Sequence, residues 1–105
     1  MVKAVIYSRV STEEQEVENQ NIALRKWAQD KGFDVVRIYQ EEESAWRVGH
    51  QRELARLLRD ARTRQFDLVL VWALDRLSRQ GPLAILTLVH RLGKYGVKVL
   101  SHQEV

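Results

Sequence analysis

The sequence predicts an α/β protein in which a parallel β-sheet carries helices on both faces. Three observations indicate this class: short apolar runs rich in β-branched residues, stretches of helical periodicity, and a regular alternation of the two along 105 residues. Such alternation needs crossover connections, which join parallel strands. No repeat, low-complexity tract or linker interrupts the pattern, so we expect a single domain over residues 1–105.

Four segments have the composition of buried strands. The first is a β-branched run interrupted only by Lys3, and the third is almost continuously apolar. Runs of this kind are typical of parallel strands that are covered on both faces. The predicted strands are residues 2–7, 33–39, 66–72 and 97–101, with a loop over residues 41–49. We expect the spatial order 2-1-3-4.

Three helices are predicted between these strands. The first covers residues 13–30, where apolar side chains recur at helical intervals. The third begins near Pro82, a residue suited to a first helical turn, and ends at Gly93 or Gly96. The second covers residues 51–63 and has one apolar face, formed by Leu54, Leu57, Leu58 and Ala61.

The composition fits a folded protein that can contact a polyanion. Hydrophobic residues make up 45% and charged residues 30%, and Lys and Arg outnumber Asp and Glu by 17 to 14, which gives a net charge of +3. The N-terminus lacks the pattern of a secretory signal, and no apolar run approaches the ~20 residues of a membrane span. We therefore expect a cytoplasmic protein without membrane contact.

The motifs exclude several classes of enzyme. Cysteine is absent and the three histidines, His50, His90 and His102, are scattered along the chain, so no metal site is expected. The sequence contains neither a Gly-rich phosphate loop followed by Lys and Ser or Thr nor a Gly-x-Ser-x-Gly elbow. ATPase and α/β-hydrolase activities are therefore not expected, and no cofactor is predicted.

Polar residues gather after two of the predicted strands. In open α/β sheets ligands bind beyond the carboxyl ends of the strands, where the strand order reverses, and for the order 2-1-3-4 this point lies between strands one and three. The first strand leads into residues 7–15 and the third into residues 72–79. Their convergence would bring together one hydroxyl, one carboxylate and three guanidinium groups, those of Ser11, Asp75, Arg9, Arg76 and Arg79.

These residue types suit attack on a phosphodiester. The transition state carries negative charge on the non-bridging and leaving oxygens, and arginine offers a permanent charge with forked donors that match it. The Ser11 hydroxyl needs a base or a stabilised alkoxide to act as a nucleophile. Asp75 could act as that base or orient an arginine.

The same residues also have structural interpretations. Ser11 and Thr12 each begin a capping-box pattern at the start of a helix. Asp75 beside Arg76 is typical of a surface ion pair. The second predicted helix also has a basic face, made by Arg52, Arg56, Arg59 and Arg62. This face could be a footprint for a nucleic-acid backbone or simply a solvated surface, and Arg52 lies nearest the predicted chemistry.

Two segments resemble the signature segments of the serine site-specific recombinases of the resolvase/invertase type. They are Tyr7-Ser8-Arg9-Val10-Ser11-Thr12 with Gln15, and Leu74-Asp75-Arg76-Leu77-Ser78-Arg79. The resemblance extends from about Lys3 to Gln103. It implies a flavodoxin-like, three-layer catalytic fold that cleaves and rejoins DNA through a covalent 5′-phosphoserine intermediate, without a metal or high-energy cofactor. It also implies that the full-length protein binds DNA and self-associates to dimers and tetramers.

The resemblance assigns roles to individual residues. The catalytic residues it implies are Ser11, Arg9, Asp75, Arg76, Arg79 and Gln15, and the substrate-binding residues are Arg52, Tyr7 and Ser8. Many relatives carry Arg-Pro where this chain has Gln51-Arg52, so the arginine's role is either shifted to Arg52 or lost. Relatives often have Ser-Gly in the preceding loop, where this chain has Ser44-Ala45. Complete family members continue into an interface helix and a DNA-binding domain, so we expect a chain truncated before these parts and inactive by itself.

Two other functions are compatible with the residues alone. A non-catalytic DNA-binding or regulatory domain of the same fold would use Ser11 only as a helix cap. A small-molecule phosphotransfer enzyme would share the architecture and nothing more. A covalent DNA adduct at Ser11 distinguishes the recombinase from both.

Overall fold

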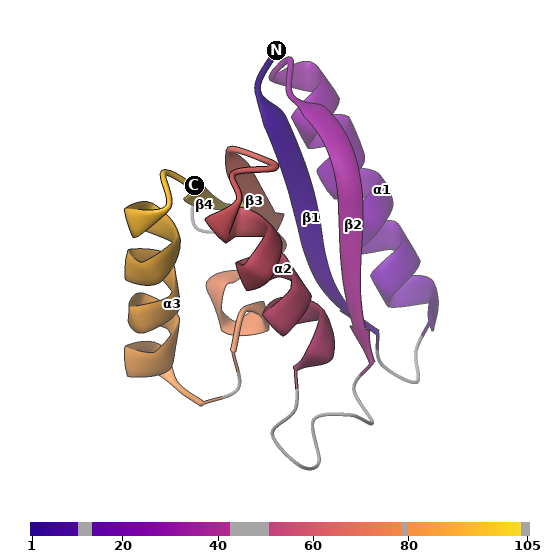
Figure 1. Ribbon diagram of the computed structural model, residues 1–105. Coiled ribbons are helices and arrows are strands. Elements are labelled where there is room, and N and C mark those ends of the chain that lie inside the picture. Colours follow the sequence, from indigo (N-terminus) through magenta and orange to yellow (C-terminus); the bar gives the residue numbers. More distant parts are fainter. Residues whose placement is uncertain (11–13, 43–50, 79, 104–105) are drawn as a thin grey trace.

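The sheet has the predicted order and is entirely parallel. The computed structural model describes residues 1–10, 14–42, 51–78 and 80–103. Within these ranges four strands form one sheet in the order β2-β1-β3-β4. The strands are β1 (Lys3–Val10), β2 (Asp34–Glu42), β3 (Leu68–Val71) and β4 (Lys98–Ser101). The predicted order is therefore confirmed, and β1 and β3 lie side by side at its centre (Figure 1).

The strand bounds differ from the predicted ones at the carboxyl ends. β1 was predicted to end at residue 7 and β2 at residue 39, but both continue for three more residues, because pairing runs to Arg9↔Glu41 and Val10↔Glu42. The prediction that the loop begins at residue 41 was therefore wrong. β3 is shorter than the predicted residues 66–72, because its pairing with β4 covers only Leu68–Val71.

Helices cover both faces of the sheet, as predicted. Helix α1 (Glu14–Asp30) lies on one face, and α2 (Arg52–Arg62) and α3 (Pro82–Lys94) lie on the other (Figure 1). Pro82 occupies the first turn of α3, and the chain leaves the helix through Gly96, whose φ of 80° is readily adopted only without a side chain. The arrangement is the expected flavodoxin-like, three-layer fold. None of the described helices combines the length and apolar character needed to cross a membrane.

The core consists of two layers separated by the sheet. The layer on the α1 side joins that helix to the β1 and β3 side chains of one parity, and contains Ala4, Ile6, Leu24, Ala28, Leu68 and Leu70. The larger layer lies under α2 and α3 and includes Val5, Tyr7, Tyr39, Leu57, Val69, Leu77 and Leu92. Successive side chains of a strand point to opposite faces, so residues 7 and 8 of β1 enter different layers.

Helix α2 is tied to β2 near its C-terminal end by a polar cluster. The Arg37 guanidinium lies 2.7 Å from the Asp60 carboxylate, and the Tyr39 hydroxyl donates to the same oxygen at 2.6 Å. Burial raises the pKa of Tyr39, and the hydrogen bond to Asp60 raises it further. A protonated Tyr39 therefore holds the helix against the edge strand.

Leu57→Ala should lower the free energy of unfolding by about 2–5 kcal/mol. Leu57 is fully buried on the apolar face of α2, so truncation removes apolar contacts and leaves a cavity. Urea unfolding followed by circular dichroism measures the change. Arg59→Ala on the exposed face of the same helix is the matched control and should change stability by no more than about 0.5 kcal/mol. Equal losses in the two variants would contradict the assigned packing of α2.

Candidate active site

The residues predicted to form a site lie at the carboxyl ends of two adjacent strands. Tyr7, Ser8 and Arg9 belong to the last half of β1. Asp75 and Arg76 belong to a single 3-10 turn, η2 (Leu74–Arg76), which follows β3. Because β1 and β3 are neighbouring parallel strands, both segments emerge at the same edge of the sheet.

Three of the predicted catalytic residues lie wholly or partly outside the described part of the structure. Ser11 and Arg79 lie outside the described residues. Gln15 lies in the first turn of α1, and its side chain is also outside the described part. The geometry of the site therefore rests on the residues on either side of these positions.

The sheet separates two of the residues predicted to bind substrate. Tyr7 belongs to the core layer under α2 and α3, whereas Ser8 has the parity of Ile6 and faces the α1 layer. Ser8 is buried, and its hydroxyl oxygen has no hydrogen-bond partner in the described part of the chain. Arg9 has the parity of Tyr7, so its side chain is directed to the α2 side.

A buried carboxylate caps the N-terminus of α2. Glu41, at the end of β2, is 2% exposed. Its oxygens accept hydrogen bonds from the backbone N–H groups of Glu53 at 3.1 and 3.2 Å and of Leu54 at 3.1 Å. These are donors of the first helical turn, which have no partner inside the helix. The positive end of the helix dipole also favours a carboxylate at this place.

The Tyr7 hydroxyl lies between this carboxylate and a glutamine amide. It donates to Oε2 of Glu41 at 3.1 Å and accepts from Nε2 of Gln51 at 2.9 Å. Burial raises the pKa of Tyr7 above its ordinary value of 10.0. The hydrogen bond from Gln51 lowers this pKa, the Glu41 carboxylate raises it, and the positive charge of Arg9 lowers it. Burial has the largest effect, so Tyr7 stays protonated at neutral pH.

Gln51 joins the two polar segments directly. Besides its bond to Tyr7, Nε2 of Gln51 donates to the backbone carbonyl of Leu77 at 3.1 Å. Leu77 follows η2, and its side chain is fully buried in the core. A continuous path of hydrogen bonds thus runs from the start of α2 through Glu41, Tyr7 and Gln51 to the segment that carries Asp75 and Arg76.

The charged side chains at this edge remain open to solvent. Asp75 is exposed and Arg76 is partly exposed, on a turn without a buried residue of its own. Arg52 is exposed at the first residue of α2. The hydrogen bonds of Glu41, Tyr7 and Gln51 connect the segments that carry these side chains, while their charges face outward, which suits contact with an anion.

The basic face predicted for α2 is exposed over its whole length. Its members are Arg52, Arg56, Arg59 and Arg62. Arg56 lies 3.1 Å from the carboxylate of Glu53 on the same helix, an exposed pair that contributes little to stability. The face is available to a partner from one end of the helix to the other.

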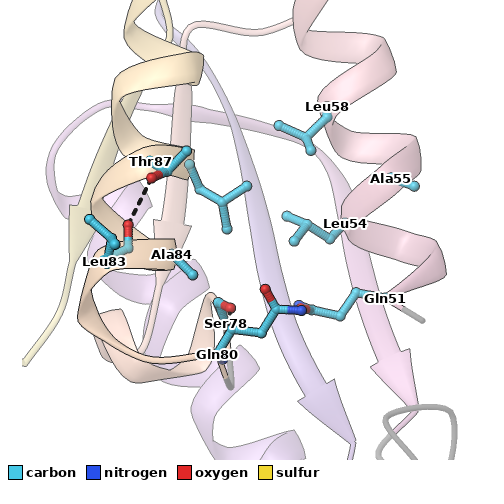
Figure 2. Close-up of a pocket in the computed structure, with 10 residues that line it drawn as sticks. Gln51, Leu54, Ala55, Leu58, Ser78, Gln80, Leu83, Ala84 and Thr87 are labelled. Atoms are coloured by element: carbon cyan, nitrogen blue, oxygen red, sulfur yellow. Dashed lines mark hydrogen bonds between the residues drawn. The ribbon is translucent and has the colours of Figure 1, made fainter. Parts of the chain in front are cut away.

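A groove between α2 and α3 opens beside these residues. Its cavity volume is about 580 Å³. Figure 2 shows Gln51, Ser78 and Gln80 at its polar end and the side chains of Leu54 and Leu58 along one wall. In the described part of the chain no cluster of three or more His, Asp or Glu side chains could hold a metal ion.

Two residues of this arrangement were not predicted to contribute to the site. Glu41 was placed at the start of a loop, and only the register that pairs it with Arg9 identifies it as a strand residue near the site. Gln51 was noted as a departure from the family pattern, but its spacing gave no indication of its partners. Both residues act through contacts with residues that are distant in sequence. A local sequence pattern gives no information on such contacts.

Tyr7→Phe should lessen the loss of stability at alkaline pH. Because the pKa of Tyr7 is raised in the folded state, the unfolded chain releases this proton first, from about pH 10, and the free energy of unfolding falls as the pH rises further. One proton corresponds to about 1.4 kcal/mol per pH unit, so the slope should be shallower by up to this amount in the variant. Urea unfolding from about pH 9 to about pH 11 measures it.

Tyr95→Phe is the control for this experiment. Tyr95 is partly exposed at the C-cap of α3, and the hydrogen bond from Arg91 lowers its pKa. Its ionisation therefore has the opposite effect on stability, and its removal should not make the slope shallower. Identical slopes in the wild type and in Tyr7→Phe would contradict the claim that burial raises the pKa of Tyr7.

Comparisons with known proteins identify the family and the fold. Residues 4–105 match the family described as Resolvase, N terminal domain, while a comparison with the curated proteins finds no match. The N-terminal catalytic domain of TP901-1 integrase is similar, with a TM-score of 0.84 and 32% identity over 97% of this chain and 78% of that chain.

Two further solved structures share the fold. The C-terminal catalytic domain of ISC1926 TnpA, an IS607-like serine recombinase, has a TM-score of 0.83 and 30% identity over 96% of this chain and 67% of that chain. A resolvase family site-specific recombinase from Streptococcus pneumoniae has a TM-score of 0.83 and 22% identity over 99% of this chain and 74% of that chain. With its parallel sheet and the polar segments after β1 and β3, the chain belongs to the resolvase N-terminal domain family and is a serine recombinase catalytic domain.

Proposed function

We propose that the hydroxyl of Ser11 attacks a DNA phosphodiester in site-specific recombination. One observation carries the proposal: Gln51 links Tyr7, in the last half of β1, to Leu77 after β3, so that hydrogen bonds join the two polar segments. Ser11 follows the first of these segments by only a few residues. Membership of the resolvase N-terminal domain family supports a serine nucleophile at this position.

The proposed reaction is an exchange of two esters. The Ser11 oxygen forms a bond to phosphorus, the bond from phosphorus to the 3′ oxygen breaks, and that oxygen leaves as a 3′ hydroxyl after taking up a proton. The phosphate then remains as a 5′-phosphoserine ester. Attack by a 3′ hydroxyl on this ester rejoins the DNA and releases Ser11, so the phosphodiester energy is conserved and the balance needs no further reactant.

The arginines of the two segments stabilise the charge that develops in this exchange. We assign Arg9, Arg76 and Arg79 to the phosphate oxygens, because a guanidinium group offers forked donors and a permanent charge. Asp75 is exposed beside Arg76, which suits either orientation of a guanidinium or acceptance of the serine proton. Gln15 helps to organise the site, and Arg52 meets the DNA backbone.

The proposed partner is DNA in the cytoplasm. The exposed basic face of α2 offers a sequence-independent contact for phosphates, whose strength should fall as salt rises. Self-association to dimers and tetramers in the full-length protein belongs to the same proposal, because recombination requires more than one cleaved strand to be held together. The reaction as written requires no cofactor.

Ser11→Ala should abolish a covalent protein–DNA adduct. The complete native protein is incubated with a library of nicked DNA duplexes of random sequence, denatured in detergent, and assayed for DNA that stays attached to protein. Peptide mass mapping should place the phosphodiester on Ser11. Ser101→Ala, at the end of β4, removes another serine hydroxyl and should retain the adduct.

The outcome distinguishes the three possible functions. Salt-sensitive DNA binding without an adduct would contradict the proposal and indicate a binding or regulatory domain. Turnover of phosphorylated metabolites without an adduct would indicate a small-molecule phosphotransfer enzyme. An adduct that persists in Ser11→Ala would assign the nucleophile to another residue.

Arg76→Ala should slow adduct formation by about 100–1,000-fold, the usual effect of removing one donor to developing negative charge. Single-turnover quenching of a DNA substrate recovered from the library measures the rate. Arg25→Ala removes an exposed arginine from α1 on the opposite face of the sheet and should leave the rate within about 2-fold, since no phosphate is expected there. Equal rates in the two variants would remove Arg76 from the site.

A further inference from the structure

We propose that Gln51 is a positioning residue for the cleavage reaction, which holds the Asp75–Arg76 turn against the end of β1 through its side-chain amide. The inference rests on the proposed function and deepens it. Gln51 itself is not proposed to touch a reacting atom. It acts through Leu77 and Tyr7, the two residues that its amide nitrogen contacts.

Gln51 does not perform the usual role of a residue at its position. It is the N-cap residue of α2, yet its side chain makes no hydrogen bond to the helix. Glu41 accepts the N–H groups of Glu53 and Leu54 in its place. The Gln51 amide is therefore available for contacts outside the helix, and both contacts are made to the site segments.

The direction of the hydrogen bonds fixes which group must be present at position 51. The Leu77 carbonyl can only accept, and the Glu41 carboxylate can only accept when ionised. Tyr7 gives its single hydrogen to Glu41, so its oxygen accepts at the other side. Only a donor with two hydrogens can stand between the Tyr7 oxygen and the Leu77 carbonyl. The amide nitrogen of Gln51 meets this requirement.

The turn that carries Arg76 depends on outside support. The 3-10 turn η2 is three residues long, and its backbone bonds from Arg76 to Ala73 and from Leu77 to Leu74, each 3.0 Å, close only single turns. Such turns have poorer hydrogen-bond geometry than an α-helix. The buried Leu77 side chain anchors the turn to the core. The hydrogen bond from Gln51 to the Leu77 carbonyl sets the distance between the turn and β1.

Loss of this bond should change the rate of cleavage more than the affinity for DNA. Arg76 would still carry its charge and attract a phosphate, but its angle to the reacting group would vary. A displacement of about 1 Å in a catalytic group can cost about 100-fold in rate. Long-range attraction to a phosphate backbone is insensitive to a shift of this size.

Three substitutions separate hydrogen-bond donation from other properties of Gln51. Gln51→Glu has almost the same shape but no donor, and its negative charge at the N-terminus of α2 suits the helix dipole. Gln51→Lys restores a donor with several hydrogens. Gln51→Met, which has neither donor nor charge, is a second loss variant if the glutamate disturbs Glu41.

The expected result is a split between rate and affinity. In the complete protein Gln51→Glu and Gln51→Met should form the Ser11 adduct about 10–100-fold more slowly, with the Kd for DNA and the midpoint of urea unfolding close to the wild type. Gln51→Lys should recover most of the rate. Gln29→Glu makes the same change at an exposed residue of α1, on the other face of the sheet, and is the matched surface control.

A second readout needs no DNA chemistry. Hydrogen exchange of the backbone amides from Leu74 to Ser78 should be faster in Gln51→Glu and Gln51→Met and close to the wild type in Gln51→Lys. If the wild type forms no adduct but this exchange pattern appears, the proposed function fails while the positioning of the turn by Gln51 stands.

Three outcomes would overturn the inference. The first is adduct formation at the wild-type rate in Gln51→Glu and Gln51→Met. The second is an equal loss in Gln51→Lys, because donation would then be irrelevant. The third is loss of the folded state in both loss variants, which would assign Gln51 to stability rather than to positioning.

Discussion

The buried carboxylate of Glu41 is the interaction on which the arrangement of the site depends. A carboxylate that is 2% exposed is costly to desolvate unless it is fully hydrogen-bonded. Here two backbone amides of α2 and the phenol of Tyr7 provide the bonds. Because these donors come from a helix and a central strand, Glu41 can be satisfied only when α2, β1 and β2 have their native positions.

This constraint divides the polar groups into a buried set and an exposed set. Tyr7 and Glu41 lie in the interior and hold elements together, whereas Arg52, Asp75 and Arg76 stand at the surface. A phosphate approaching the edge of the sheet would therefore meet cations whose backbone is already fixed. Less reorganisation is needed when charge develops, which is how preorganised electrostatic sites lower a barrier.

Helix α2 has a particular place in this arrangement because it is anchored to β2 at both ends. Glu41 holds its first turn, and the Arg37–Asp60 pair holds its last turns. Between these points Leu54, Leu57 and Leu58 pack into the core. The basic face is consequently fixed in orientation relative to the site, so a DNA backbone lying along the helix would have a defined path to the carboxyl end of the sheet.

The sequence was sufficient to predict the fold, because each element has an apolar period of its own and the alternation of elements determines the topology. The meeting of the segments after β1 and β3 followed from strand order alone. The lengths of β1 and β2 could not be predicted, because the polar residues Ser8, Arg9 and Gln40 interrupt the apolar runs while pairing between strands continues past them.

The network beneath the site could not be predicted for a different reason. An acid such as Glu41 is normally exposed, and its burial depends on donors supplied by other elements. Gln51 has the sequence position of a helix cap, but its side chain joins β1 to the segment that follows η2. For Ser11 and Arg79, which lie outside the described residues, the sequence remains the basis of their assignment.

The long pairing of β1 with β2 determines which face of the sheet each side chain at this edge occupies. Tyr7, Tyr39 and Glu41 face α2 because residues two apart share a face of a strand. One residue added to β2 before Glu41 would turn Gln40 or Glu42 inward and send the carboxylate toward α1. A change in the length of this strand therefore keeps Glu41 on the α2 side only in even steps or with a compensating bulge, such as the one-residue shift where the pairing steps from Ala4↔Val35 to Val5↔Arg37.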